Sequence, residues 1–264
     1  MEILNLIPII YAKFALFILA FTRISAMMIT FNLFRTELIT PRVSLILASI
    51  LAVYVILFTQ TAMPIGNIFS IKNTLNLLFQ FLIGFLTSLF LNFILEIFVA
   101  AGQVLSTQFG FGMISLFDPR MGMITSLTHF YLILISLIFF AMNGHLLVIK
   151  ILVESFNYLP IDGFYIPSRL LLKIANYASV MFSGAMVLAM ILVLCILLTN
   201  ISLAVMTKFA PQFNLFSVGI NMTIIIGLVS AYLAYDIFVE KGFQFIQEGV
   251  TALQHLITSA KVNG

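Results

Sequence analysis

Long stretches without a charged residue run through almost the whole chain. Each is at least as long as the roughly 20 apolar residues needed to cross the hydrocarbon layer of a membrane, and a charge at the centre of that layer costs roughly 2.5–3.5 kcal/mol. A chain with this pattern folds in lipid or against other apolar protein, which excludes a water-soluble globular domain. The uncharged stretches are Val43–Ile71, Asn73–Leu95, Ile97–Phe117, Met121–Ile149, Ile174–Thr207 and Phe209–Tyr235.

Prolines and charges divide the apolar sequence into helices. An earlier stretch, Pro8–Ile29, is equally apolar but contains Lys13 and Arg23. Because proline cannot continue a helix interior, the later prolines mark breaks, and the pattern predicts about six long helices. We therefore expect an all-α, polytopic membrane-type protein with a single domain. Basic residues do not gather in alternate loops, so the charge pattern assigns no orientation.

The C-terminal part of the chain has a different pattern. After Asp236, apolar residues recur at alternating spacings of three and four, which is typical of an amphipathic helix with a narrow apolar stripe. We expect this helix to pack on a partner or a membrane surface. The residues of the stripe are Phe243, Ile246, Val250, Leu253 and Ile257.

Composition excludes several classes of function. The chain is 62% hydrophobic and 8% charged, whereas soluble domains have roughly 45–50% apolar and about 25% charged residues. Its net charge of +3 is spread along the chain without a polybasic block, so nucleic acid is not an expected partner. Cys195 is the single cysteine, which excludes an intrachain disulfide and a cluster of thiol ligands.

The polar residues do not form a recognisable catalytic or metal-binding pattern. The histidines lie in different segments without HExxH spacing, and the aspartates lie outside helix centres. We therefore predict no catalytic residue, no cofactor and no metal site, and we interpret His145 as a polar contact at a helix start. The residues considered are His129, His145, His255, Asp118, Asp162 and Asp236.

The segment Gln103–Gly122 is unusual, because it connects two apolar helices and is itself apolar. Irregular backbone at membrane depth is tolerated only where protein buries it or where it lines a cavity. Its glycines permit close approach, and its Asp-Pro pair predicts an exit turn. The segment is either a hydrophobic barrier that closes a pore or a re-entrant packing element without a gating role. Its candidate barrier residues are Phe109, Gly110, Phe111, Gly112, Met113, Ile114, Ser115, Phe117, Asp118 and Pro119.

Three charged residues, Lys13, Arg23 and Glu96, lie inside the predicted apolar helices. Such residues usually face a partner or a water-filled cavity. They indicate either an ion or proton path, or a structural ion pair between helices, or a misplaced helix end. Glu96 could pair with either basic residue, and the sequence does not choose between them.

Three stretches together resemble one protein family. They are Phe109–Pro119, Asn143–Ile161 and Thr199–Gly219. Each resembles the FliR/SctT family of type III secretion export-gate subunits, in which FliR proteins form the flagellar branch and SctT proteins the injectisome branch. The start of the second stretch favours the flagellar branch. The motif residues are Asn143, His145, Ala210, Pro211, Gln212 and Gly219.

The resemblance implies a function. Members of this family are structural and gating subunits of an export gate, through which unfolded flagellar proteins cross the bacterial inner membrane at the flagellar basal body. It implies one copy of this chain in a helical complex with P- and Q-type subunits, other flagellar export membrane proteins nearby, and no cofactor. Residues 1–173 would be similar to a P-type subunit and residues 174–264 to a Q-type subunit. The plug loop of the family matches Ser106–Gly122.

The chain departs from the family pattern at one point. Ile220-Asn221-Met222 replaces the usual aromatic-Pro-Leu run, which puts an expected helix break in doubt. Two alternatives to the flagellar assignment are an injectisome export-gate subunit and a secondary transporter with Arg23 and Glu96 as its intramembrane site. The transporter alternative lacks the inverted repeat, or the matched pair of broken helices, that many transporters contain.

Overall fold

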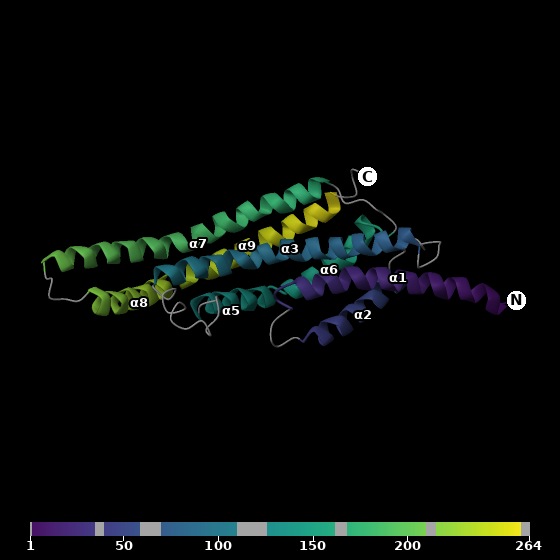
Figure 1. Ribbon diagram of the computed structural model, residues 1–264, viewed down its shortest axis with the longest axis horizontal. Helices are drawn as coiled ribbons and strands as arrows, with labels where there is room; N and C mark the ends of the chain where they lie inside the picture. Colours follow the sequence, from purple (N-terminus) through teal and green to yellow (C-terminus); the bar gives the residue numbers. More distant parts are fainter. Residues whose placement is uncertain are drawn as a thin grey trace. The chain divides into compact units, whose positions relative to one another are not determined.

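The computed structural model describes residues 2–34, 40–58, 70–109, 126–161, 168–209 and 215–259. All regular secondary structure within these ranges is helical, which confirms the predicted all-α class. The helices are drawn in Figure 1. They are α1 (Glu2–Thr30), α2 (Pro41–Phe58), α3 (Ile71–Gln108), α5 (Ser126–Ala141), α6 (Gly144–Tyr158), α7 (Ser168–Phe209), α8 (Leu215–Leu233) and α9 (Tyr235–Ser259).

Helix α3 joins two uncharged stretches that the sequence pattern had separated at Glu96. It has 38 residues, which corresponds to a length of about 57 Å. Glutamate is a good helix former, and the half-buried Glu96 continues the helix rather than ending it. A single charge in this chain is therefore not a helix boundary.

In contrast to α3, which spans two uncharged stretches, the single uncharged stretch Met121–Ile149 contains parts of two helices, α5 and α6. Asn143 has a φ angle of 55°, in the left-handed region that asparagine adopts more readily than most residues. Its carbonyl accepts the N–H groups of Leu146 (3.0 Å) and Leu147 (3.2 Å) in the first turn of α6. An asparagine, rather than a proline, makes this break.

Several helices can cross a membrane. In the described part of the chain, four are long and apolar enough: α1 from Ile10, α2, α3, and α7 from Leu170. The pairs α5 with α6 and α8 with α9 also qualify, although each pair is bent by more than 40° at a short break. The number rises to six if each pair counts as one span. These helices confirm the predicted polytopic membrane-type protein.

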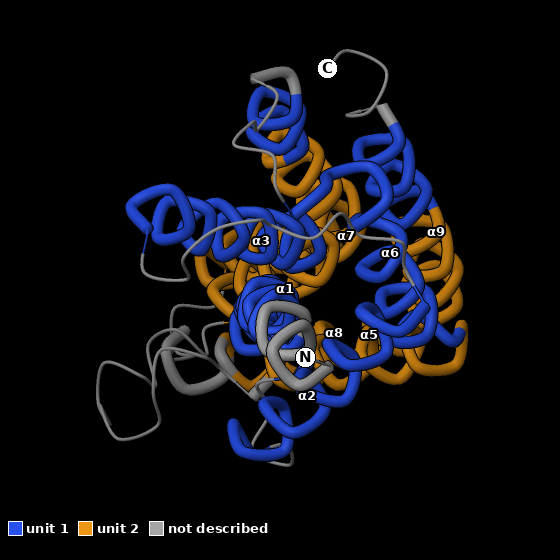
Figure 2. Tube along the Cα trace, turned by 90° about the vertical axis from the view of Figure 1, so that its right-hand side faces the viewer, with its two compact units in different colours: residues 1–93, 143–177, 248–264 blue, residues 94–142, 178–247 orange. Residues whose placement is uncertain are grey.

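The chain forms two compact units, which are coloured separately in Figure 2. Unit 1 contains residues 1–93, 143–177 and 248–264, and unit 2 contains residues 94–142 and 178–247. Three of the four boundaries fall inside α3, α7 and α9, so each of these helices contributes to both units, and the fourth lies between α5 and α6. These units differ from the division expected near residue 173, which separates a part similar to a P-type subunit from a part similar to a Q-type subunit. That division stays a prediction.

In unit 1, α1 packs on α2 and also lies close to α3. A Cβ atom added to Gly84 of α3 would overlap the backbone carbonyl of Arg23 in α1. At the end of α1, Nδ2 of Asn92 donates to the carbonyl of Thr30 (2.8 Å), and its Oδ1 accepts the N–H of Asn32 (2.9 Å). A side chain of α3 therefore caps the C-terminus of α1.

In unit 2, aromatic rings and glycines bring the helices together. The rings of Phe98 and Phe245 meet edge to face with centroids 6.3 Å apart, and Tyr131 stacks on Phe238 at 4.7 Å. A Cβ atom at Gly102 would lie 2.9 Å from the Tyr131 ring. Close approach at small residues is typical of helix packing in membranes.

The C-terminal helix α9 confirms the helix expected after Asp236, but its apolar stripe packs differently from the expectation. Ile246, Val250, Leu253 and Ile257 are buried within the chain, and Phe243 is 41% exposed. The expectation that the whole stripe meets a partner or a membrane surface is therefore wrong. The chain itself covers most of the stripe.

Candidate functional site

The expected barrier loop begins later than the sequence indicated, because α3 continues to Gln108. The N–H of Phe109 donates to the carbonyl of Leu105 (2.9 Å), so Phe109 is attached to the last turn of the helix. The first residue that favours a break is Gly110. The remaining candidate barrier residues lie outside the described residues: Gly110, Phe111, Gly112, Met113, Ile114, Ser115, Phe117, Asp118 and Pro119.

Phe109 is a buried residue of unit 2 and is 1% exposed. Its ring lies against Gly227 in α8, where an added Cβ atom would overlap the ring and lie 2.8 Å from both Cδ1 and Cζ. Gly227 is itself buried. The start of the loop is therefore held by a side chain that packs on bare helix backbone.

Two polar side chains lie near this end of α3. The hydroxyl of Thr128 donates to Oε1 of Gln103 (3.1 Å), which links α5 to α3. Ser106 is fully buried, and its hydroxyl has no hydrogen-bond partner among the residues that the structure describes. A buried hydroxyl without a partner destabilises a fold by about 1–3 kcal/mol.

Arg23 is the centre of a polar cluster in unit 1. It is fully buried, and its Nε donates to Oε1 of Gln80 (2.7 Å) in α3. Its two terminal nitrogens donate to Oγ of Ser155 in α6 (3.2 Å) and to the carbonyl of Leu159 (2.8 Å). The guanidinium carbon also lies 4.2 Å from the centroid of the Phe156 ring, which is a cation–π arrangement.

Gln80 extends the cluster by two further hydrogen bonds. Its Nε2 donates to Oδ1 of Asn76 (3.1 Å) and to the carbonyl of Ile161 (3.2 Å). Arg23 and Gln80 together hold α1, α3, the end of α6 and the segment that follows it. Within the described residues, the hydrogen bonds of Arg23 all go to uncharged groups, which indicates an anchoring role rather than an ion path.

The other two charged residues of the predicted helices do not belong to this cluster. Lys13 is exposed on α1. Glu96 is half-buried in the part of α3 that belongs to unit 2. Among the described residues, the hydrogen bonds of Arg23 go to Gln80, Ser155 and Leu159, which all lie in unit 1.

The motif residues fall at helix ends. Asn143 precedes α6, and His145 is a half-buried residue in its first turn. Gly219 is buried in α8, where its carbonyl accepts the hydroxyl of Thr223 (2.9 Å). Ala210, Pro211 and Gln212 lie outside the described residues. Helix α8 runs unbroken through residues 220–222, so the break that the family pattern indicated there is absent.

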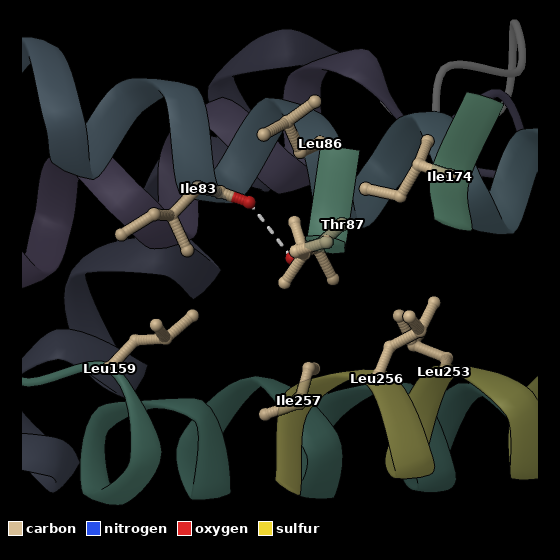
Figure 3. Close-up of a pocket in the computed structure, with 9 residues that line it drawn as sticks. Ile83, Leu86, Thr87, Leu159, Ile174, Leu253, Leu256 and Ile257 are labelled. Carbon is tan, nitrogen blue, oxygen red and sulfur yellow. Dashed lines mark hydrogen bonds between the residues drawn. The ribbon is translucent and has the colours of Figure 1, made fainter. Parts of the chain in front are cut away.

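A cavity of about 20 Å³ lies in unit 1 (Figure 3). The hydroxyl of Thr87 points along its own helix and donates to the carbonyl of Ile83 (2.8 Å). The cavity has room for about one water molecule, but its lining is almost entirely aliphatic and offers no free polar group. It is a packing defect between helices and not a ligand site. The lining residues are Ile83, Leu86, Thr87, Leu159, Leu170, Ile174, Leu253, Leu256 and Ile257.

A larger, more open groove of about 340 Å³ lies between α6 and the end of α9 in unit 1. Its polar lining includes Glu154, Tyr158 and His255. Glu154 also approaches Lys150 one turn away (3.9 Å), which is an exposed helix pair. Among the described residues, no group of three or more potential His, Cys, Asp or Glu ligands could hold a metal ion.

Sequence reasoning missed the partners of Arg23 and the contact of Phe109. Asn76 and Gln80 lie four residues apart in a mainly apolar helix, a spacing that places both on one face. This pair could have indicated a buried polar partner. Gly227 interrupts the apolar run Thr223–Val229, but no sequence signal connects it to Phe109.

Comparison with known proteins gives consistent matches. The sequence model of the bacterial export proteins, family 1, matches residues 14–249. The flagellar biosynthetic protein FliR of Buchnera aphidicola subsp. Baizongia pistaciae (strain Bp) is 31% identical over 219 residues, 82% of this chain and 84% of that protein. FliR of Aquifex aeolicus (strain VF5) is 28% identical over 247 residues, 92% of this chain and 94% of that protein. The surface presentation of antigens protein SpaR of Shigella flexneri is 27% identical over 155 residues, 58% of this chain and 60% of that protein.

Proposed function

The chain belongs to the bacterial export proteins, family 1, and we propose that it is a structural and gating subunit of the flagellar type III export gate. It lies in the bacterial inner membrane at the flagellar basal body. Its substrates are unfolded flagellar proteins that pass through the gate. It carries no catalytic activity and needs no cofactor, because its role depends on how its helices pack and move apart.

The observation that carries this function is the match over nearly the whole chain. The family match covers residues 14–249, and relatives named flagellar biosynthetic protein align over 80% or more of the chain. The long apolar helices agree with a protein of the membrane export apparatus. The polar cluster of Arg23 supports a structural role, since its contacts with Gln80, Ser155 and Leu159 are those of an anchor. They do not favour the transporter alternative.

The length of α7 supports an assembly with other subunits. This helix has 42 residues and is about 63 Å long, and exposed apolar side chains follow it from Leu171 to Phe209. The hydrocarbon layer is about 30 Å thick, so the helix would have to tilt by about 60° to lie within it. Membrane helices tilt by about 0–40°. Neighbouring protein is therefore needed to cover part of this apolar face.

We assign that cover to P- and Q-type export-gate subunits, with one copy of this chain in each complex. Within it, residues 1–173 take the place of a P-type subunit and residues 174–264 that of a Q-type subunit. We further assign the plug of the closed gate to the part of residues 106–122 that follows α3. The burial of Phe109 at the start of this loop supports the assignment, because a plug must be attached at a fixed point.

The test of the function is export in a flagellated bacterium that lacks its own copy of this subunit. Expression of this chain with its own P- and Q-type subunits should restore filament-protein export and motility. The purified complex should contain one copy of this chain by native mass spectrometry, and the chain expressed alone should aggregate in detergent. A monodisperse monomer that restores no export would contradict the proposal.

An injectisome export gate is the second candidate, because SpaR of Shigella flexneri is also similar to this chain. That similarity covers 58% of the chain, whereas the similarities to FliR of Buchnera aphidicola subsp. Baizongia pistaciae and of Aquifex aeolicus cover 82% and 92% of it. Export measured in a flagellated strain and in an injectisome strain, each without its own copy of this subunit, distinguishes the two candidates. Restoration of needle-protein export in an injectisome strain, without restoration of filament-protein export, would favour the second candidate.

A further inference from the structure

We propose that the exposed face of α9 between Glu240 and His255 lines the water-filled passage of the export gate and contacts the extended polypeptide in transit. The inference rests on the proposed function and deepens it, because it assigns the surface along which the exported protein moves. Three observations carry it: the polarity of this face, its fixed orientation, and its contrast with the exposed face of α7.

One side of α9 is both exposed and polar. In the segment 240–255, every exposed residue except Phe243 is polar. The spacing of these residues, mostly three or four, places them on one side of the helix. The face is about 22 Å long at 1.5 Å per residue, which is a large part of the roughly 30 Å hydrocarbon layer. Its polar residues are Glu240, Gln244, Gln247, Glu248, Thr251 and His255.

The opposite side of α9 fixes the orientation of this face. Ile246, Val250 and Leu253 are buried in the chain itself. A rotation of the helix that hid the polar face would expose these apolar side chains and would bury two carboxylates, which is costly. The polar face therefore points away from the packed side of the chain.

Hydrocarbon is an unfavourable environment for the polar face. Glu240 and Glu248 belong to it, and a charge at the centre of the hydrocarbon layer costs roughly 2.5–3.5 kcal/mol. Helix α9 is nevertheless part of a bent pair, with α8, that is long and apolar enough to span a membrane. Ionisable residues in such segments usually face a partner or a water-filled cavity.

The exposed face of α7 shows what a surface for a partner subunit looks like in this chain. Between Met186 and Leu198, every exposed residue is apolar. The cores of protein interfaces are enriched in methionine and aromatic residues and depleted of glutamate. The face of α7 fits this composition, and the face of α9 does not. We therefore assign α7 to a partner subunit and the polar face of α9 to water.

The polar groups of the face suit an unfolded substrate. The side-chain amides of Gln244 and Gln247 and the hydroxyl of Thr251 can each donate and accept hydrogen bonds. An extended polypeptide presents one N–H and one C=O group at each residue other than proline, whatever its sequence. Such a face binds the common backbone of different exported proteins and does not select one sequence.

The experiment measures the reactivity of single cysteines in the complete export gate. Cys195 is the single cysteine of the chain, so every variant carries Cys195→Ala. A charged maleimide reports contact with water, because the thiolate is the reactive form of cysteine. A bismaleimide reports contact with a filament protein that has one introduced cysteine and a folded C-terminal fusion that stalls it in the gate. The test variants are Gln244→Cys, Gln247→Cys and Thr251→Cys, and the matched controls on the exposed face of α7 are Met190→Cys and Leu194→Cys.

We expect the three cysteines of α9 to react with the charged maleimide several-fold faster than the two controls. The stalled filament protein should slow this reaction, and the bismaleimide should join it to the cysteines of α9 but not to those of α7. After denaturation of the complex, all five variants should react equally, which shows that the differences come from the assembled structure.

Two outcomes would overturn the inference. If the cysteines of α9 react as slowly as the controls, protein covers the face. If they react quickly but are neither protected by the stalled protein nor joined to it, the face meets water outside the passage. A gate with only Cys195→Ala separates this inference from the proposed function: no export by that gate, beside export by the wild-type gate of the host, contradicts the function, whereas normal export with unreactive α9 cysteines refutes the inference alone.

Discussion

Replacement of Arg23 tests whether the buried cluster of unit 1 depends on charge or on the shape of the guanidinium. Arg23→Lys keeps the positive charge but has a compact head that cannot reach Gln80, Ser155 and Leu159 together. Arg23→Met removes the charge and keeps an unbranched side chain of similar length. An ion path would tolerate lysine better than methionine, and an anchor would not.

The structure gives an approximate magnitude for each variant. Hydrogen bonds from a charged donor contribute about 1.5–3 kcal/mol each, so the loss of two of the three in Arg23→Lys destabilises by about 3–6 kcal/mol. Arg23→Met loses all three and a cation–π contact of about 2 kcal/mol. However, it also removes a buried charge whose desolvation opposes folding by several kcal/mol. We therefore expect Arg23→Met to be no less stable than Arg23→Lys.

The assay is the melting temperature of the purified export-gate complex in detergent, together with the amount of complex per cell. Arg23→Lys should melt well below wild type, with Arg23→Met at or above the lysine variant. Lys13→Met serves as a control, because Lys13 is exposed on the same helix, and it should melt close to wild type. An Arg23→Lys complex with wild-type stability and export, beside a defective Arg23→Met complex, would refute the anchoring role.

Three further predictions follow from the loop and from two backbone positions. Deletion of residues 110–115 should leave the gate assembled but leaky to ions. Replacement of both loop glycines, Gly110 and Gly112, by valine should instead leave the gate ion-tight with little export. A deletion variant as ion-tight as wild type would contradict the assignment of the plug. Asn143→Gly should preserve the melting temperature, because glycine adopts φ of 55° without strain. Asn143→Val should destabilise by at least about 1–2 kcal/mol, and equal stability of the two would disprove the role of the left-handed backbone. Gly84→Ala should strongly reduce the amount of complex, because the new Cβ atom meets the backbone of Arg23 rather than a flexible side chain; normal accumulation would show that α1 and α3 can separate at this point.

The all-α class and most of the helices could be predicted from the sequence, because lipid tolerates few unpaired charges and the uncharged stretches are long. The boundaries were less predictable. The pattern places Glu96 inside an apolar helix, as found in α3, but that helix ends at Gln108, within the segment Gln103–Gly122 that was expected to be a loop. Asn143 was treated as the start of a motif, but its left-handed backbone divides one predicted stretch into two helices.

The sequence could single out individual residues of the candidate sites, but it could not predict which residues they contact. Arg23 was identified from the cost of a charge inside an apolar helix, which is a property of the residue alone. Its partners Gln80 and Ser155 lie 57 and 132 residues away, and nothing in a local pattern specifies contacts at such separations. The same holds for Phe109 and Gly227, whose fit depends on the distance between two helices.

The cap that Asn92 places on the end of α1 has a consequence for synthesis of the chain. The carbonyl of Thr30 is satisfied by a residue 62 positions later in the sequence. At a translation rate of about 5–20 residues per second, the ribosome needs about 3–12 s to reach Asn92 after it has added Thr30. During that interval the carbonyl of Thr30 lacks the hydrogen bond that Asn92 supplies in the folded chain. The C-terminus of α1 can therefore be capped only after α3 has been synthesised as far as Asn92.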